Sequence, residues 1–174
     1  MGQELTKIKK RISSVSGAYK VTSAMKLVST VKLKKWKNKM IANKEYSSQI
    51  EKTINMLLMC SKDVKSPYFA QDKNQKRLFI IVSSTLGLCG SYNNNMLRLA
   101  DANITPNDDL LILGGKALIH YADKPNKKIE GFDNFSSTQD KALVSKVTNY
   151  ILQEYEKGTY GEIHLIYSEY KNSL

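Results

Sequence analysis

The chain has 174 residues, of which 41% are hydrophobic, and its 27 basic and 16 acidic residues give a net charge of +11. That length accommodates one compact domain with an extended appendage. Cys60 and Cys89 are too few for a disulfide framework and lack metal-ligand spacing, so we expect a reducing compartment. No stretch reaches eighteen uninterrupted apolar residues and no signal-peptide pattern opens the chain, which argues against a membrane span and against secretion.

The first sixty residues predict one very long helix. From Gln3 to Cys60 there is no proline and only one glycine, Gly17. Such a helix would be roughly 87 Å long at 1.5 Å per residue, whereas helices of globular proteins average roughly 11 or 12 residues. A helix of that length indicates a mechanical or interfacial role.

The positive charge is concentrated in this helix. Residues 1–45 hold eleven lysines and Arg11 against Glu4 and Glu45, a net charge of +10, so the other residues sum to about +1. A strongly basic element implies an acidic partner, which is nucleic acid, an anionic membrane surface or a protein lined with carboxylates. A solvated lysine face is the simpler alternative.

An apolar stripe also follows the predicted helix. Its first members step by 3, 4, 3 and 4, the heptad spacing of a coiled-coil seam: Leu5, Ile8, Ile12, Val15 and Tyr19. It continues less regularly through Met25, Val28, Val31, Trp36, Met40, Tyr46, Ile50, Ile54 and Leu57, as in a helix that changes partners along its length. Burial of such side chains stabilises by roughly 1.5–3 kcal/mol each, so a second helix is expected beside this one. The helical pattern at residues 140–157 is too short to supply it.

After Ser61 the pattern changes to short apolar strands alternating with helices. Strands are predicted at Lys76–Ser84, Asp109–Leu113 and Gly161–Ser168, the first and the last of them buried, with a further short strand suggested at Lys127–Gly131. Helices are predicted at Asn93–Ala102, Lys116–Asp123 and Thr138–Glu156. This alternation predicts an α/β fold with a mainly parallel sheet and right-handed crossovers. The expected domains are a shaft helix at 1–60, a linker at 61–75 and a Rossmann-like domain at 76–174.

Two glycine-rich turns are the candidates for ligand binding. Gly87–Gly90 and Gly114–Lys116 each lie between a strand and a helix, where backbone N–H groups can cradle a phosphate. The turns lack both the Gly-Lys-Ser/Thr of a phosphate loop and the complete three-glycine dinucleotide fingerprint. Structural turns are therefore the better interpretation.

The other polar residues suggest no catalytic or metal-binding group. His120 and His164 have no Cys, Asp or Glu at ligand spacing, and Asp108-Asp109 is typical of a turn that enters a strand. We therefore expect no catalytic residue, no metal and no cofactor.

Two stretches of the sequence are distinctive. In the helix they are Ile12, Ser14 and Val15 followed by the run Lys20–Val28, and after the first strand they are Val82–Ser84 followed by Gly87–Asn93. Both resemble the γ subunit of F-type ATP synthases, in its N-terminal helix and in its first strand with the glycine turn. Gly114–Lys116 and Tyr170–Leu174 resemble weaker landmarks of that family in the same order.

The resemblance implies a non-catalytic rotor shaft. In that family the N- and C-terminal helices form an antiparallel coiled coil inside a hexamer of three α and three β subunits. A Rossmann-like domain at the foot binds the ε subunit and the membrane ring of c subunits. ATP is bound by β, and rotation couples ATP synthesis or hydrolysis to proton transport. The implied location is the cytoplasmic face of a bacterial cell membrane, where the chain is peripheral.

The resemblance also implies which residues meet partners. The expected contacts with the hexamer are Lys9, Lys10, Arg11, Lys20, Met25 and Lys26. Exposed ion pairs, typically worth about 0.2–1 kcal/mol, can re-form with successive carboxylates of β and so would not stop rotation. A flexible thioether can likewise pack against changing neighbours. Gly87, Cys89 and Gly90 are expected to form a structural turn at the rotor foot.

Two features depart from the family pattern. Thr85 and Leu86 occupy the place of the usual Asp-Arg before the glycine turn, which implies a lost polar contact with ε. The family continues beyond Leu174 into more sheet and the long C-terminal helix, so we expect a portion of a longer protein. Three alternatives stay open: a γ-like shaft of a divergent rotary ATPase that drives other mechanical work, a basic nucleic-acid-binding protein, and a nucleotide-dependent enzyme.

Overall fold

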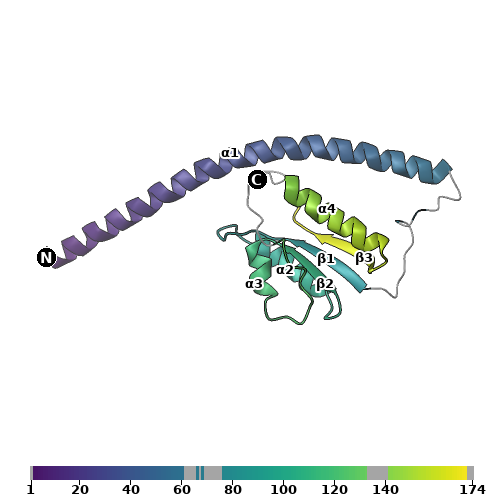
Figure 1. Cartoon of the computed structure of the whole chain (residues 1–174). Helices are drawn as coiled ribbons and strands as arrows, with labels where there is room; N and C mark the ends of the chain where they lie inside the picture. Colours follow the sequence, from purple (N-terminus) through teal and green to yellow (C-terminus); the bar gives the residue numbers. More distant parts are fainter. Residues whose placement is uncertain (1, 61–65, 67, 69–75, 133–140, 172–174) are drawn as a thin grey trace. The chain divides into compact units, whose positions relative to one another are not determined.

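The computed structural model describes residues 2–60, 66, 68, 76–132 and 141–171. The chain divides into two compact units, Met1–Val64 and Lys65–Leu174 (Figure 1). The first unit contains one helix, α1 (Gly2–Cys60), which confirms the predicted long helix. None of the helices in the described part of the chain is long and apolar enough to cross a membrane.

α1 runs for 59 residues without a break. Its sequence is rich in lysine, which favours helix, and it contains no proline that would remove a backbone donor. Hydroxyl groups of Thr22, Thr30, Ser47 and Thr53 donate hydrogen bonds to the carbonyl four residues earlier, at 2.8–2.9 Å, so these residues are satisfied within the helix. Among its described side chains, all are exposed except the half-buried Met40 and Ser48.

The second unit is built on a parallel three-stranded sheet in the order β2-β1-β3. Its strands are β1 (Lys76–Val82), β2 (Asp109–Leu113) and β3 (Tyr160–Ile166). β1 is central, with Leu78 paired to Asp109 on one side and to Ile163 on the other. Because a central parallel strand is covered on both faces, the apolar run of β1 is continuous rather than alternating.

Three helices cover the two faces of the sheet: α2 (Tyr92–Asn103), α3 (Gly115–His120) and α4 (Lys141–Glu156) (Figure 1). Phe79 and Ile81 of β1 belong to a core cluster with residues of α2 and α3. The alternate residues Leu78 and Ile80 belong to a second cluster, against which α4 packs. This division follows from the two-residue period of a strand, which sends successive side chains to opposite faces.

The structure corrects two details of the predicted fold. β3 was expected to be buried, but Leu165 is 56% exposed. Both β2 and β3 are edge strands of the described sheet, but residues 127–129 hydrogen-bond to the outer side of β2, which is buried throughout. The segment Lys127–Gly131 is not a strand, since it touches β2 only through an isolated bridge between Leu110 and Lys128. Thr138, the predicted first residue of α4, lies outside the described residues.

Candidate functional site

The first candidate surface is the apolar seam of α1. Because α1 is uninterrupted, the 3-4 spacing of Leu5 to Tyr19 can be continued along it, and it reaches six further apolar positions: Leu33, Trp36, Met40, Ile50, Ile54 and Leu57. Apart from the half-buried Met40, these side chains are exposed; Ile12 is 63% exposed and Tyr19 71%. A strict seven-residue repeat drifts by about 20° per heptad on a straight helix, so a partner helix would wind around α1 with a left-handed twist.

The seam is interrupted where a second apolar surface begins. Between Tyr19 and Leu33 its positions hold Thr22, Lys26 and Ser29. Over the same stretch five exposed apolar residues lie off the seam, and four of them follow one another at steps of 4, 3 and 3: Val21, Met25, Val28 and Val31. The apolar face of α1 therefore rotates away from the seam at Val21 and returns to it at Leu33, as expected of a helix that changes partners along its length.

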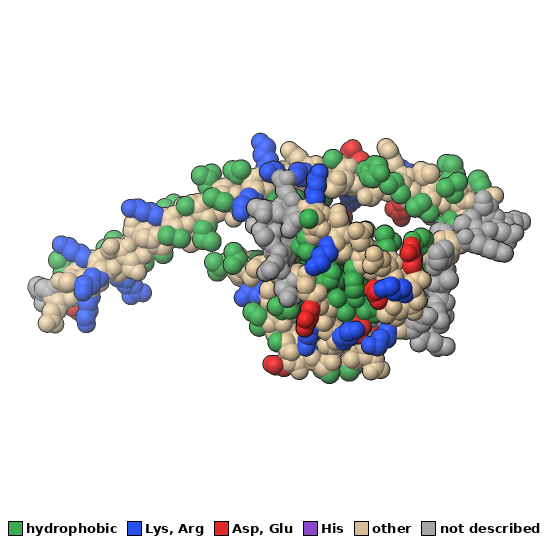
Figure 2. Space-filling view, in the orientation of Figure 1, with side chains coloured by type: hydrophobic (Ala, Val, Ile, Leu, Met, Phe, Trp, Pro, Cys, Tyr) green, Lys and Arg blue, Asp and Glu red, His purple; other side chains and the backbone are tan. Residues whose placement is uncertain are grey.

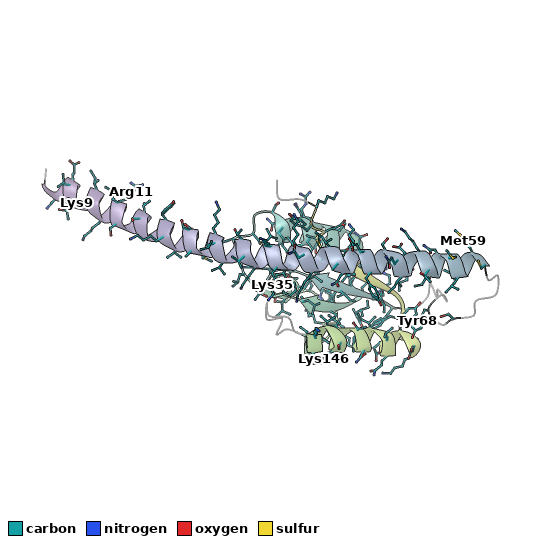
Figure 3. All side chains as sticks on the ribbon, turned by 90° about the horizontal axis from the view of Figure 1, so that it is seen from above. Lys9, Arg11, Lys35, Met59, Tyr68 and Lys146 are labelled. Carbon is teal, nitrogen blue, oxygen red and sulfur yellow. The ribbon has the colours of Figure 1, made fainter. Side chains whose placement is uncertain are left out.

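The six residues expected to contact a hexamer are all exposed on α1, but they do not form one patch. Lys9, Lys10 and Arg11 are consecutive, so at 100° per residue they spread around the helix at one level. Met25 and Lys26 lie roughly 21 Å further along, and Lys26 falls on the seam itself. Figure 2 shows basic side chains along α1 with hydrophobic ones between them, and in Figure 3 Lys9 and Arg11 project from its N-terminal part. A partner that meets all six must therefore surround the helix.

The second candidate surface is the glycine turn after β1. Asn93, in the first turn of α2, holds this turn through its side-chain amide. Its Oδ1 accepts from the backbone N–H of Ser84 at 3.1 Å, and its Nδ2 donates to Ser84 Oγ at 2.8 Å and to Cys89 Sγ at 3.0 Å. Gly90 has a φ of +57°, and so has no steric cost in the left-handed conformation that closes the turn. Sequence reasoning missed this role of Asn93, whose signal is an Asn three residues after the last glycine of the turn.

The turn carries an exposed, strained leucine. Leu88 has a φ of +61°, which is rare for a residue with a side chain, and it is 96% exposed. Beside it lies a cavity of about 430 Å³ between the glycine turn and α3, lined by residues that include Gly87, Cys89, Asn93, Lys116 and His120. Of these, Lys116 offers a cation, but Cys89 Sγ contacts an amide and a hydroxyl rather than a base. The arrangement is that of a closed turn rather than a nucleophile paired with a base.

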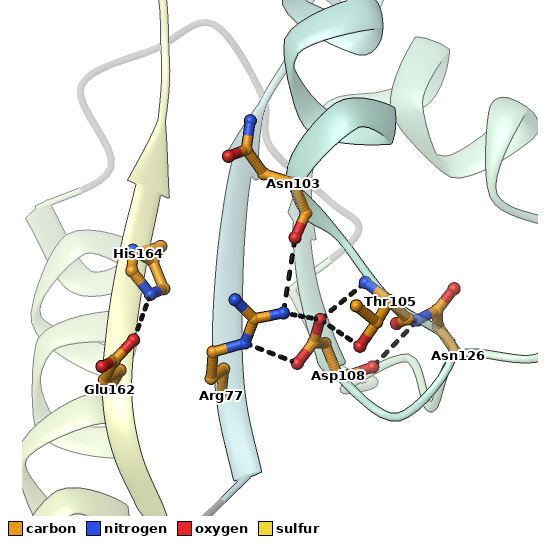
Figure 4. Close-up of polar contacts among 7 residues, drawn as sticks. All are labelled: Arg77, Asn103, Thr105, Asp108, Asn126, Glu162 and His164. Carbon is orange, nitrogen blue, oxygen red and sulfur yellow. Dashed lines mark hydrogen bonds and ion pairs between the residues drawn. The ribbon is translucent and has the colours of Figure 1, made fainter. Parts of the chain in front are cut away.

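The two histidines each have a carboxylate beside them, which sequence spacing did not predict. His120 Nε2 lies 2.9 Å from Asp101, which also accepts from Lys124 and from the hydroxyl of Tyr121. His164 Nε2 lies 3.0 Å from Glu162 (Figure 4). Among the described residues, no three His, Cys, Asp or Glu side chains come together as metal ligands would.

Asp108 and Asp109 lie at the entry to β2 and form structural contacts, as expected of a strand-entry turn. Arg77 donates to both oxygens of Asp108, at 2.9 and 2.7 Å, and Thr105 donates to the same carboxylate through its backbone N–H and its hydroxyl (Figure 4). Asp109 accepts from Lys76 and from Tyr160 at 3.0 Å. Both carboxylates are therefore held within the fold rather than presented to a ligand.

The chain therefore combines a long helix that carries an exposed heptad seam, as in coiled-coil proteins, with a parallel α/β unit. The family model described as ATP synthase matches residues 4–174. The chain therefore belongs to the ATP synthase family.

Individual relatives agree with this family. The chain is 32% identical over 170 residues to the ATP synthase gamma chain of Mycoplasmopsis agalactiae, covering 96% of this chain and 59% of the relative. It is 31% identical over 173 residues to the ATP synthase gamma chain of Clostridium perfringens, covering 97% and 61%, and 32% identical over 176 residues to that of Mesoplasma florum, covering 98% and 60%. The chain thus spans about three fifths of the length of these relatives.

Proposed function

We propose that this chain acts as the central shaft, the γ subunit, of an F-type ATP synthase. It transmits rotation between a catalytic hexamer and a proton-translocating ring and takes no part itself in the chemistry of ATP. The observation that carries the proposal is the exposed heptad seam on a 59-residue basic helix, in a chain that matches ATP synthase gamma chains over nearly its full length.

The proposal assigns a partner to each surface. A second helix packs on the seam of α1, and three α and three β subunits surround the resulting shaft. The α/β unit forms the foot, which meets the ε subunit and the ring of c subunits. In a bacterium the assembly stands on the cytoplasmic face of the cell membrane, with this chain peripheral to it.

The basic residues of α1 fit a shaft that must turn. Lys9, Lys10, Arg11 and Lys20 are exposed and would meet acidic loops of β. Each exposed ion pair contributes only about 0.2–1 kcal/mol, so the pairs can exchange as the shaft rotates. Met25 is 51% exposed and flanks the seam, so its side chain is available to the hexamer that surrounds the shaft.

Native mass spectrometry of the complex that contains this chain, in gentle extracts of its own cells, tests the proposal. The expected mass corresponds to one copy of the shaft subunit with three copies of each of two larger subunits. Any further subunits found in the same complex would show whether the rotor drives proton transport or other mechanical work. A free chain, or one bound to nucleic acid and released by salt, would overturn the proposal.

A further inference from the structure

The lysines near the middle of α1 have a particular place relative to the seam. In each four-residue step of a seam, the first and third intervening residues flank it on opposite sides; we call these the flanking positions. For the step from Trp36 to Met40 they are Lys37 and Lys39. The next flanking residues outward are Lys32 on the side of Lys39 and Lys44 on the side of Lys37. Both sides of the seam are therefore basic over this stretch.

These lysines border apolar seam residues rather than open surface. Leu33 and Trp36 are exposed seam residues, and the Nζ of Lys39 lies 5.3 Å from the centre of the Trp36 ring. A flanking ammonium group thus lies against the residue that a partner helix would cover. In coiled coils, charges at these positions pair across the interface and decide which helices associate.

We propose that the helix packing on α1 between Leu33 and Asn43 carries aspartate or glutamate at its own flanking positions. This inference deepens the proposed function and rests on its statement that α1 pairs with a second helix. Because both flanks are basic, the acidic requirement holds whether the partner runs parallel or antiparallel. A second copy of this chain is disfavoured in that register, since lysine would face lysine.

The basic flanks also define where the partner must align. Along the seam from Ser16 to Thr30, no flanking position is charged, as the residues there are Ser16, Ala18, Ser23, Met25 and Thr30. An acidic stretch of the partner therefore gains ion pairs at residues 32–44 and none in the stretch before it. Lys9 and Arg11 flank the step from Ile8 to Ile12 in the same way, four heptads earlier, so the charges favour registers that place acidic residues of the partner beside one of these two basic blocks.

The test uses the full chain and two synthetic probe helices of about four heptads each. Both probes have leucine at the seam positions and are identical except at the flanking positions, which are glutamate in one and lysine in the other. Fluorescence anisotropy measures the binding of each probe to the full chain near physiological salt. We expect the glutamate probe to bind at least about tenfold more tightly, since several exposed ion pairs contribute together.

Two double variants separate flanking charge from net charge. Lys37→Glu with Lys39→Glu changes flanking positions, whereas Lys34→Glu with Lys35→Glu changes the two residues of the preceding three-residue step, which point away from the seam. The first is expected to lose the preference for the glutamate probe, and the second to keep most of it. The milder pair Lys37→Gln and Lys39→Gln is expected to weaken glutamate-probe binding by about threefold or more.

Three results would overturn the inference: equal losses in both Glu variants, equal binding of the two probes, or binding of neither. Equal losses would mean that net charge attracts any polyanion, including nucleic acid or an anionic membrane. The proposed function fails separately. If the chain joins a hexamer but does not bind the glutamate probe, the proposed function stands and this inference fails. If the chain prefers the glutamate probe but joins no hexamer, this inference stands and the proposed function fails.

Discussion

Gly114 is a residue at which the α/β unit tolerates little change. It follows β2 with a φ of +108°, and a Cβ atom there would lie 2.2 Å from the carbonyl oxygen of Ser83. That close approach brings the ends of β1 and β2 together, where the backbone N–H of Ser83 donates to Leu113 and the Ser83 hydroxyl accepts from Ala117. Glycine is required at this position for both backbone conformation and space.

We expect Gly114→Ala to destabilise the α/β unit by about 2–3 kcal/mol or more, because it combines backbone strain with a backbone clash. Urea unfolding followed by circular dichroism measures the loss. Gly17→Ala is the matched control, since Gly17 lies in α1 with nothing within 4 Å of an added Cβ. That change should leave the unit unaffected and favour the helix by up to about 1 kcal/mol. Equal stability of the two variants would contradict the role given to Gly114.

Asp108 should make the stability of the unit depend on acid pH. Burial raises the pKa of its carboxyl, but hydrogen bonds from Arg77 and Thr105 outweigh burial and leave the pKa below its usual value. A carboxyl whose pKa is lowered by folding stabilises the fold fully above its unfolded pKa of about 3.9. That contribution is lost as the pH falls through the lower folded value.

We therefore expect Asp108→Asn to lower the melting temperature at neutral pH, with a loss of about 1.5–3 kcal/mol from charge-assisted hydrogen bonds. The difference from the unchanged chain should shrink as the pH falls below about 4, where the native carboxyl also becomes neutral. Melting temperatures measured from pH 2.5 to 7 would show this convergence. Asp123→Asn removes an exposed carboxylate and serves as control; parallel curves for Asp108→Asn would disprove the assignment.

At the scale of elements, the pattern of apolar residues has a different cause in α1 than in β1. β1 is apolar at every position from Leu78 to Ile81 because helices cover both of its faces. In the described part of its own unit, α1 has no element packed on its apolar residues, so their spacing indicates contacts with partners. Its two apolar surfaces, the seam and the face at Val21–Val31, indicate two different neighbours.

The second of these surfaces can be tested at Met25. In the assembled complex, we expect Met25→Lys to reduce the protons moved per ATP hydrolysed, because a fixed charge replaces a thioether that adapts to changing neighbours. Proton pumping and ATP hydrolysis measured together give this ratio. Leu27→Lys makes a comparable change two residues away on another side of α1 and should have a smaller effect. If Met25→Lys left the ratio of protons moved to ATP hydrolysed unchanged, the proposed contact between Met25 and the hexamer would be wrong.

At the scale of the whole molecule, charge and burial are divided between the two units. Both core clusters draw their buried members from residues 78–166, so the α/β unit has an interior of its own. The net charge of +10 within residues 1–45 instead belongs to α1, whose described side chains are almost all exposed. One unit is organised around its interior and the other around its surface, which suits a foot and a shaft.

The sequence by itself determined the features that depend on near neighbours. The run from Gln3 to Cys60 predicted α1 because helix formation depends on residues within a few positions, and proline is absent there. The strand Asp109–Leu113 was predicted at its observed bounds, since a short apolar run between turn residues is a local signal. The resemblance in the helix and the glycine turn also pointed to the family that the comparison then showed.

Only the tertiary structure decided features that join distant residues. The edge position of β3, the pairing of His120 with Asp101 and the locking of the glycine turn by Asn93 depend on which segments lie side by side. The apolar strands β2 and β3 both lie at edges of the described sheet, yet β2 is buried throughout and Leu165 of β3 is exposed, so the local pattern could not decide the burial of Leu165. The local pattern determines which secondary structure a residue favours, whereas its burial and its partner depend on the packing of the whole unit.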